Sequence, residues 1–127
     1  LVGSEMCIRD RNDSEGLMDL ISCGAHIVFL VTGRGNVVGS AVSPCIKITG
    51  NRETFRRMNG DMDFDASPVL YGECTQDEQA DRLMDYVVQV AKGNLSKGEE
   101  LGHREYFVPY KYQEKEVAFR KCEKTEI

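Results

Sequence analysis

A short apolar run, Ile27–Val31, is followed by a glycine-rich loop and then directly by a second apolar run, and this order restricts the folds open to the chain. Ile27–Val31 is continuous and rich in β-branched residues, which is typical of a strand covered on both faces. The loop occupies Gly33–Ser43, and Pro44 leads into the second predicted strand, Ile46–Thr49. Strands covered on both faces need helices above and below the sheet, so the order predicts an α/β fold.

Helical segments are predicted before and after these strands. Asp13 or Ser14 can cap a helix that continues to about Cys23, and Asn51 can cap one or two further helical turns.

The clearest helix runs from Thr75 to about Lys92. Thr75 and Glu78 form a capping box, and apolar residues then recur at three- and four-residue spacing. The residues that we expect to face the sheet are Leu83, Met84, Val87 and Val88. Together these elements predict the C-terminal part of a three-layer α/β/α (Rossmann-like) domain with a short, mostly parallel sheet.

Charge and cysteine usage exclude several classes of protein. The net charge is −5 and no basic stripe is present, which argues against a nucleic-acid-binding surface. The longest apolar run, Ala25–Val31, is too short to cross a membrane, and no signal peptide is recognisable. The five cysteines include no C-x-x-C pair, so no zinc or iron–sulfur motif is indicated, and Cys23 and Cys45 are expected to be buried. We therefore expect a cytoplasmic protein with reduced thiols.

The glycines of the loop first suggest a dinucleotide site. Gly33, Gly35 and Gly39 give the spacing G-x-G-x-x-x-G after a strand. A dinucleotide site requires such a loop to open a helix whose N-terminus holds the pyrophosphate. Here Pro44 and the next strand follow within a few residues of Gly39, so the nucleotide interpretation fails.

An anion site remains as the functional interpretation of this loop. Glycines let the backbone amides approach an anion, and Arg34 supplies a planar fork that matches a carboxylate. Ser40 and Ser43 can bind hydroxyl groups. An isolated G-R-G is most simply a tight turn with a surface arginine, but in this longer context we favour binding.

The remaining polar candidates are aspartates and histidines. Asp61, Asp63 and Asp65 lie on one side if the segment is extended, and divalent metals take such oxygen ligands. A turn role is preferred for Asp61 and Asp65, whereas Asp63 stays open between a turn and a ligand. His26 opens an apolar strand and is expected to be structural. His103 lies in a polar segment and can act as an acid, a base or a metal ligand.

Several of these motifs, taken in order, resemble the C-terminal region of the galactarate/altronate dehydratase family. The matching segments are Thr32–Gly35, Val37–Ala41 with Ser43–Pro44, Gly60–Asp63, and Leu101–His103 with Glu105. T-G-R-G is common to the family, whereas V-V-G-S-A, G-D-M-D and L-G-H-x-E are more similar to its galactarate branch. The resemblance covers roughly Glu15–Tyr112. The related sulfolactate sulfo-lyase subunit shares much of the pattern.

The resemblance implies a hydro-lyase of sugar acid catabolism that converts galactarate to 5-dehydro-4-deoxy-glucarate. Alternatives within the family are an altronate dehydratase and a sulfolactate sulfo-lyase subunit. An alternative of another class is a non-catalytic sugar-acid-binding module. The family is similar to iron(II)-requiring enzymes, so the implied cofactor is Fe²⁺ or another divalent metal, with ligands that the sequence does not identify.

The resemblance also implies roles for individual residues. Arg34 would hold a substrate carboxylate, and the loop around it would bind the hydroxyl groups of the sugar acid. His103 and Asp63 are the candidates for proton transfer or metal binding. The implied substrate-binding residues are Thr32, Gly33, Arg34, Gly35, Asn36, Ser40 and Ser43.

The two ends of the chain depart from this pattern. The first ten residues, LVGSEMCIRD, resemble the translation of a sequencing adapter, and we interpret residues 1–11 as an artefact. Residues 12–112 would then be a dehydratase domain fragment, and residues 113–127 a charged tail. This implies that N-terminal domains of the same chain are missing and that the fragment alone is inactive. The full-length enzyme is expected to be a homo-oligomer.

Overall fold

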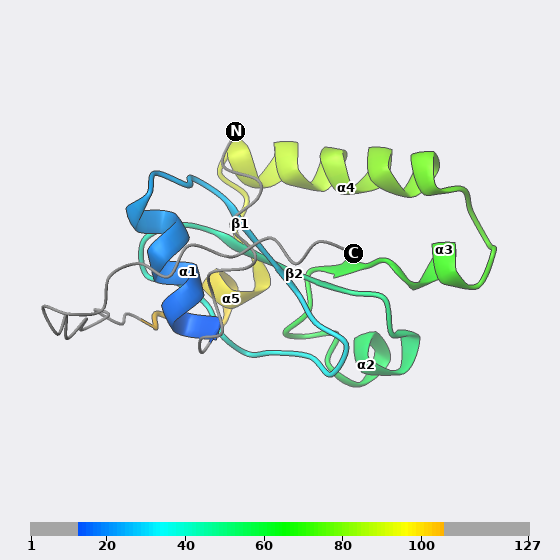
Figure 1. The fold of residues 1–127 in the computed structure, drawn as a ribbon, viewed down its shortest axis with the longest axis horizontal. Helices are drawn as coiled ribbons and strands as arrows, with labels where there is room; N and C mark the ends of the chain where they lie inside the picture. The colour runs from blue at the N-terminus through cyan, green and yellow to red at the C-terminus, as the bar shows by residue number, and fades with distance from the viewer. Residues whose placement is uncertain (1–12, 106–127) are drawn as a thin grey trace, which may run out of the picture.

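The computed structural model describes residues 13–105, which contain five helices and three strands (Figure 1). The elements are α1 (Asp13–Ser22), β1 (Val28–Val31), β2 (Cys45–Thr49), α2 (Arg52–Arg57), β3 (Phe64–Asp65), α3 (Ser67–Leu70), α4 (Gln76–Ala91) and α5 (Lys97–Glu100). The predictions made for residues 1–11 and 113–127 lie outside this range. No helix in the described range combines the length and the apolar composition that a membrane crossing requires.

The three strands form one parallel sheet in the order β1-β2-β3. Val28 lies opposite Cys45 and starts the β1–β2 pairing, and Ile48 lies opposite Phe64 in the β2–β3 pairing. All five residues of the central strand β2 are buried, as expected for a parallel strand with a helix layer on each face. The predicted α/β class with a short parallel sheet is confirmed, but the prediction that the first strand is covered on both faces was wrong, because Phe29 and Val31 of β1 are 48% and 73% exposed.

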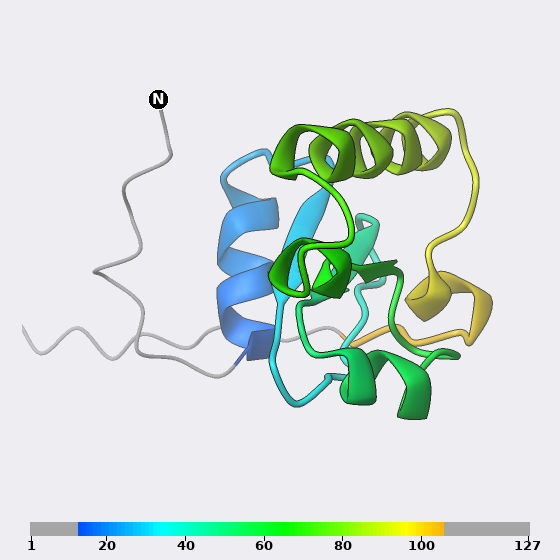
Figure 2. The same cartoon turned by 90° about the vertical axis from the view of Figure 1, so that its right-hand side faces the viewer.

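Successive side chains of β2 point to opposite faces of the sheet, and each face has its own apolar core. Ile46 and Ile48 pack with Val90 of α4 in one cluster, and Cys45 packs with Leu17 and Met18 of α1 in the other. In Figures 1 and 2, α4 runs along one side of the sheet, and α1 and α5 lie on the other. The arrangement is therefore three-layered.

Of the two cysteines expected to be buried, only Cys45 is. Its exposure is 2%, and burial raises the pKa of its thiol to about 11. Cys23 is exposed, so the prediction for it was wrong. Its position explains the difference: Cys23 follows the end of α1 in a turn closed by Gly24, which adopts a φ of +97°.

Helix α4 begins and ends as predicted, but only half of the residues expected to face the sheet do so. Thr75 and Glu78 form the capping box, with Thr75 Oγ1 accepting the Glu78 amide at 3.2 Å. Leu83 and Val87 pack against the core, whereas Met84 and Val88 are 58% and 44% exposed. The helix face that packs on the sheet, here called the core stripe, consists of Leu83, Tyr86, Val87 and Val90. Met84 and Val88 each follow a residue of this stripe and are therefore rotated by about 100° away from it around the helix axis.

Leu83→Ala should therefore destabilise the chain more than Met84→Ala. Leu83 is partly buried in the core of the α4 face, so its truncation is expected to lower the free energy of unfolding by about 2 kcal/mol, the lower end for a core leucine. Met84 is mostly exposed, so its truncation should change the free energy of unfolding by about 0.5 kcal/mol or less. Urea unfolding of the two variants measures both values. Equal losses would show that the core stripe is wrongly placed.

Candidate functional site

The glycine-rich loop leaves the end of β1 and is fixed to α2. Thr32 Oγ1 accepts the Gly35 amide at 3.2 Å, and Thr54 Oγ1 of α2 donates to the Gly33 carbonyl oxygen at 2.8 Å. Gly35 has a φ of +88° and lies against Met58, so only glycine fits without strain. Arg34 between the two glycines is exposed, and its guanidinium has no hydrogen bond or ion pair to any residue in the described range. The loop thus presents a free guanidinium from a fixed turn.

The other polar side chains predicted to bind substrate also shape this loop. Asn36 Nδ2 donates to Asp13 Oδ2 at 2.5 Å, and its Oδ1 accepts the Val38 amide. Ser40 is buried, and its Oγ accepts the amides of Val42 and Ser43 at 3.1 and 3.3 Å. The Ser43 hydroxyl donates to the Ala25 carbonyl. These contacts hold the loop, and a role of the same side chains toward substrate stays a prediction.

Asp63 is the centre of a hydrogen-bond network that joins three distant elements. Its Oδ2 accepts the Lys47 amide of β2 at 2.8 Å, and its Oδ1 accepts the Lys97 amide at 2.7 Å and the Tyr86 hydroxyl at 2.9 Å. Burial, and then the Asp63 charge, raises the pKa of Tyr86. Asp65 has the turn role expected for it, since its Oδ1 accepts the Ser67 amide at 2.9 Å. Both Asp63 oxygens are therefore occupied.

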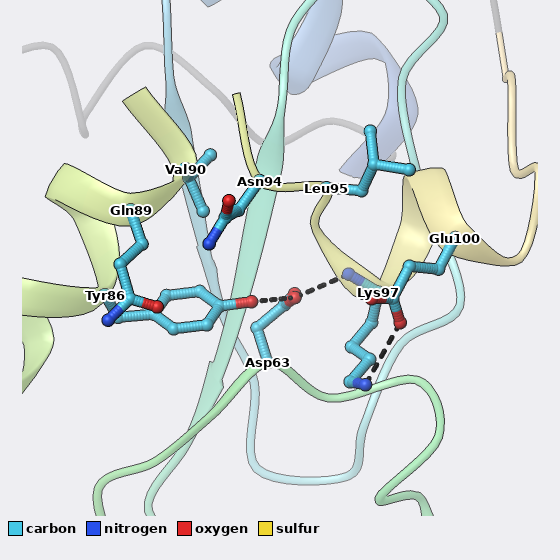
Figure 3. Close-up of a pocket in the computed structure, with 8 residues that line it drawn as sticks. All are labelled: Asp63, Tyr86, Gln89, Val90, Asn94, Leu95, Lys97 and Glu100. Carbon is cyan, nitrogen blue, oxygen red and sulfur yellow. Dashed lines mark hydrogen bonds and ion pairs between the residues drawn. The ribbon is translucent and has the colours of Figure 1, made fainter. Parts of the chain in front are cut away.

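A pocket of about 380 Å³ lies beside this network, between α4 and α5 (Figure 3). Asp63 lies between Tyr86 and Lys97 in its lining, and the Lys97 ammonium pairs with Glu100 at 3.1 Å. Its other lining residues are Gln89, Val90, Asn94 and Leu95. Sequence analysis did not locate this pocket, because it forms only where Asp63 meets the fold of residues 86–100, which supply the rest of its lining.

A second polar cluster lies around Lys47, on the face of the sheet that α1 covers. Lys47 is wholly buried, and its Nζ has no hydrogen-bond partner. A Cβ on Gly98 would lie 3.6 Å from that Nζ. His103 follows on the same segment, and its Nδ1 is buried without a partner. Glu105 accepts the Gly39 amide at 2.9 Å, which lowers the pKa of its carboxyl, as do the nearby charges of His103 and Lys47.

Sequence analysis missed Lys47, although a local signal was present. A lysine stood in the middle of Ile46–Thr49, a strand predicted to be covered on both faces. A charged side chain in such a strand must find a partner or serve a function.

The structure separates the predicted catalytic side chains. His103 lies beside Gly39 and Gly98, whereas Asp63 is bonded to Lys47, Lys97 and Tyr86. Arg34, at the loop tip beside α2, belongs to neither cluster. The three residues therefore occupy three neighbourhoods around the same sheet.

The residues in the described range do not by themselves fit a metal centre. Between Asp13 and Glu105, no group of three or more histidines, cysteines, aspartates and glutamates is placed to hold a metal ion. Asp63, a candidate ligand, has both oxygens in protein hydrogen bonds. An iron site of the kind that the family resemblance implies would need ligands from elsewhere.

Comparison with known proteins gives one family and two relatives. The model of the family described as D-galactarate/altronate dehydratase, C-terminal, matches residues 3–114. The chain is 38% identical over 85 residues to (2R)-sulfolactate sulfo-lyase subunit beta from Chromohalobacter salexigens, which covers 67% of this chain and 22% of that protein. It is 31% identical over 94 residues to altronate dehydratase from Escherichia coli, covering 74% of this chain and 19% of that protein. The chain thus spans about a fifth of the length of these relatives. No solved structure gives a significant match.

Proposed function

Because the chain belongs to the D-galactarate/altronate dehydratase family, we propose that it is part of the C-terminal domain of a hydro-lyase that converts galactarate to 5-dehydro-4-deoxy-glucarate. The observation that carries the proposal is the loop that presents Arg34. Thr32 and Thr54 fix the backbone on both sides of this residue, and the guanidinium is left free for a ligand. A fixed guanidinium matches the two oxygens of a carboxylate.

Loss of water from a hydroxy acid requires removal of a proton next to a carboxylate, which adds charge to an anionic group. A guanidinium that already binds this carboxylate stabilises the added charge. Arg34 is assigned to that task. His103 is assigned to proton transfer, because an imidazole can act as an acid or a base. Asp63 is assigned to support, since its hydrogen bonds fix Tyr86 and the start of α5.

The rest of the enzyme would complete this site. The aligned segments are 22% and 19% of the two relatives, so other domains of the same polypeptide would contribute to substrate binding. We propose that these domains supply the ligands of Fe²⁺ or another divalent metal, since residues 13–105 contain no suitable group. A complete, oligomeric enzyme of the cytoplasm is the expected form.

Other substrates remain as competing proposals. The names of the two relatives favour altronate or (2R)-sulfolactate as the compound from which a group is eliminated. All these compounds carry a carboxylate, so the role of Arg34 is common to them. A non-catalytic sugar-acid-binding module is the competing proposal of another class, and turnover of any of the three compounds would exclude it.

Arg34→Lys in a complete enzyme that contains this domain tests the proposal. Lysine keeps the charge and loses the fork, so kcat/KM should fall about 10- to 100-fold, as expected for loss of a charge-assisted hydrogen bond. A rise in KM with unchanged kcat would indicate that Arg34 binds the substrate and the transition state equally well. A fall in kcat would indicate that Arg34 makes its contact in the transition state.

Arg57→Lys is the matched control, because Arg57 is an exposed arginine on α2. It should leave steady-state rates on galactarate, altronate and sulfolactate unchanged. An Arg34→Lys enzyme that is folded and fully active would remove Arg34 from the site. Turnover of sulfolactate alone would overturn the assignment of galactarate.

A further inference from the structure

Lys47 carries a charge that no group in the described range neutralises by contact. Its side chain is 0% exposed, and its Nζ makes no hydrogen bond. Burial of an ammonium group without a partner opposes folding strongly, so buried lysines are paired or serve a function. The position therefore calls for an anion that the described chain does not provide.

The carboxylates near Lys47 are engaged elsewhere. Asp63 accepts the backbone amide of Lys47, not its ammonium. Glu105 accepts the Gly39 amide, and Glu100 pairs with Lys97. The charge of Lys47 does act on Glu105, because it contributes to the lowered pKa of that carboxyl, but the two side chains form no ion pair.

Gly98 keeps a side chain away from the ammonium, and Gly39 lets His103 approach the loop. A Cβ on Gly98 would lie 3.6 Å from Lys47 Nζ and 3.5 Å from the Gly39 Cα. A Cβ on Gly39 would lie 2.7 Å from the Cβ of His103. The segment that carries Gly98 and His103 can thus lie directly on the loop that carries Gly39, with Lys47 beneath both.

A second unpaired nitrogen lies on the segment that carries Gly98. His103 Nδ1 is buried and makes no hydrogen bond, and the His103 backbone is fixed by its amide, which donates to the Gly98 carbonyl at 2.8 Å. Lys47 Nζ is a donor, and an imidazole nitrogen that carries a proton is another. One donor lies beside Gly98 and the other belongs to the residue that packs on Gly39, and two such donors suit an oxyanion.

We infer that Lys47 and His103 form a binding site for a small oxyanion of the carboxylate class, enclosed between the Gly39 loop and the segment 98–105. The hydrogen bond from the Gly39 amide to the exposed Glu105 closes the site, and its separation opens the site to a ligand. The site itself rests on the geometry alone. Only its assignment to the second carboxylate of a sugar diacid rests on the proposed function.

Anion binding can be tested on the 127-residue chain without any enzyme assay. Thermal unfolding is followed in acetate, sulfate and galactarate, each against chloride at equal ionic strength. The wild-type chain should unfold at a higher temperature in at least acetate and galactarate, because a ligand that binds the folded state stabilises it. The ¹⁵N signals of Lys47 Nζ and His103 Nδ1 should shift in the same titration.

Lys47→Met is the informative variant, and Lys97→Met is its control. Methionine fills a similar volume without charge, so Lys47→Met should be at least as stable as wild type in chloride and bind acetate at least about tenfold more weakly, since a charged hydrogen bond is lost. Lys97 is partly exposed and paired with Glu100, so Lys97→Met should respond to acetate as wild type does.

Several results would overturn the site. One is a melting temperature of the wild-type chain that is the same in every anion. Another is a Lys47→Met variant whose melting temperature responds to acetate as that of wild type does. A third is a ¹⁵N signal of Lys47 Nζ that shifts in the Glu105→Gln variant but not when an anion is added to wild type. If Lys47→Met does not fold, the ¹⁵N titration of wild type decides alone. Anion binding at Lys47 in a chain whose complete enzyme has no lyase activity would sink the proposed function and keep this site.

Discussion

Asp63→Ala is expected to lower the free energy of unfolding by about 3–5 kcal/mol, because it leaves three hydrogen-bond donors without an acceptor and each costs about 1–3 kcal/mol when buried. The donors are the backbone amides of Lys47 and Lys97 and the hydroxyl of Tyr86. They come from β2, the start of α5 and α4. The variant should therefore loosen the sheet, α4 and α5 together. Urea unfolding followed by circular dichroism measures the loss.

Two further variants identify the cause. Asp61→Ala removes a neighbouring carboxylate for which no partner is found in the described range, and it should change stability by about 0.5 kcal/mol or less. Tyr86→Phe removes one of the three donors and should lose about 1 kcal/mol. If Asp63→Ala is as stable as Asp61→Ala but a complete enzyme that carries it has lost activity, Asp63 acts in chemistry and not in support.

Local patterns predicted five of the eight elements in the described range, but not β3, α3 or α5. The capping box of Thr75 and Glu78 and the apolar spacing after it located α4, and the run Ile27–Val31 located β1. Each signal lies within one turn or one strand, where hydrogen bonding and burial follow the order of residues. The prediction that Met84 and Val88 face the sheet was wrong for the same reason. The spacing of apolar residues fixes the direction of the buried face of a helix only to within about one residue, which is about 100°.

The contacts of the site could not be predicted in this way. Asp63 meets partners 16, 23 and 34 residues away, and Gly39 meets Glu105 across 66 residues. A turn aspartate and a network aspartate have the same local sequence, so Asp63 stayed open between two roles. Lys47 differs, because its conflict with a buried strand was visible in the sequence and only its neighbours required the structure.

The three glycines of the loop differ in what they require, and this gives the second large effect. Gly39→Val should lower the free energy of unfolding by about 3 kcal/mol, the upper end for a side chain forced into a packed site. The added Cβ alone would lie 2.7 Å from the Cβ of His103 and 2.9 Å from its carbonyl oxygen. Because one of these atoms is backbone, rotation of a side chain cannot relieve the contact. The segment 98–105 must move away from the loop, and the hydrogen bond from the Gly39 amide to Glu105 is lost.

Gly33 is the matched control within the same loop. It has no positive φ, and a Cβ at this position would meet nothing within 4 Å, so Gly33→Ala should be close to neutral in stability. Amide exchange of His103, whose amide donates to Gly98, reports whether the segment has separated, and it should accelerate in Gly39→Val only. A Gly39→Val chain with wild-type stability and unchanged exchange would show that the segment does not lie on the loop. The enclosure of Lys47, which depends on that contact, would then be lost as well.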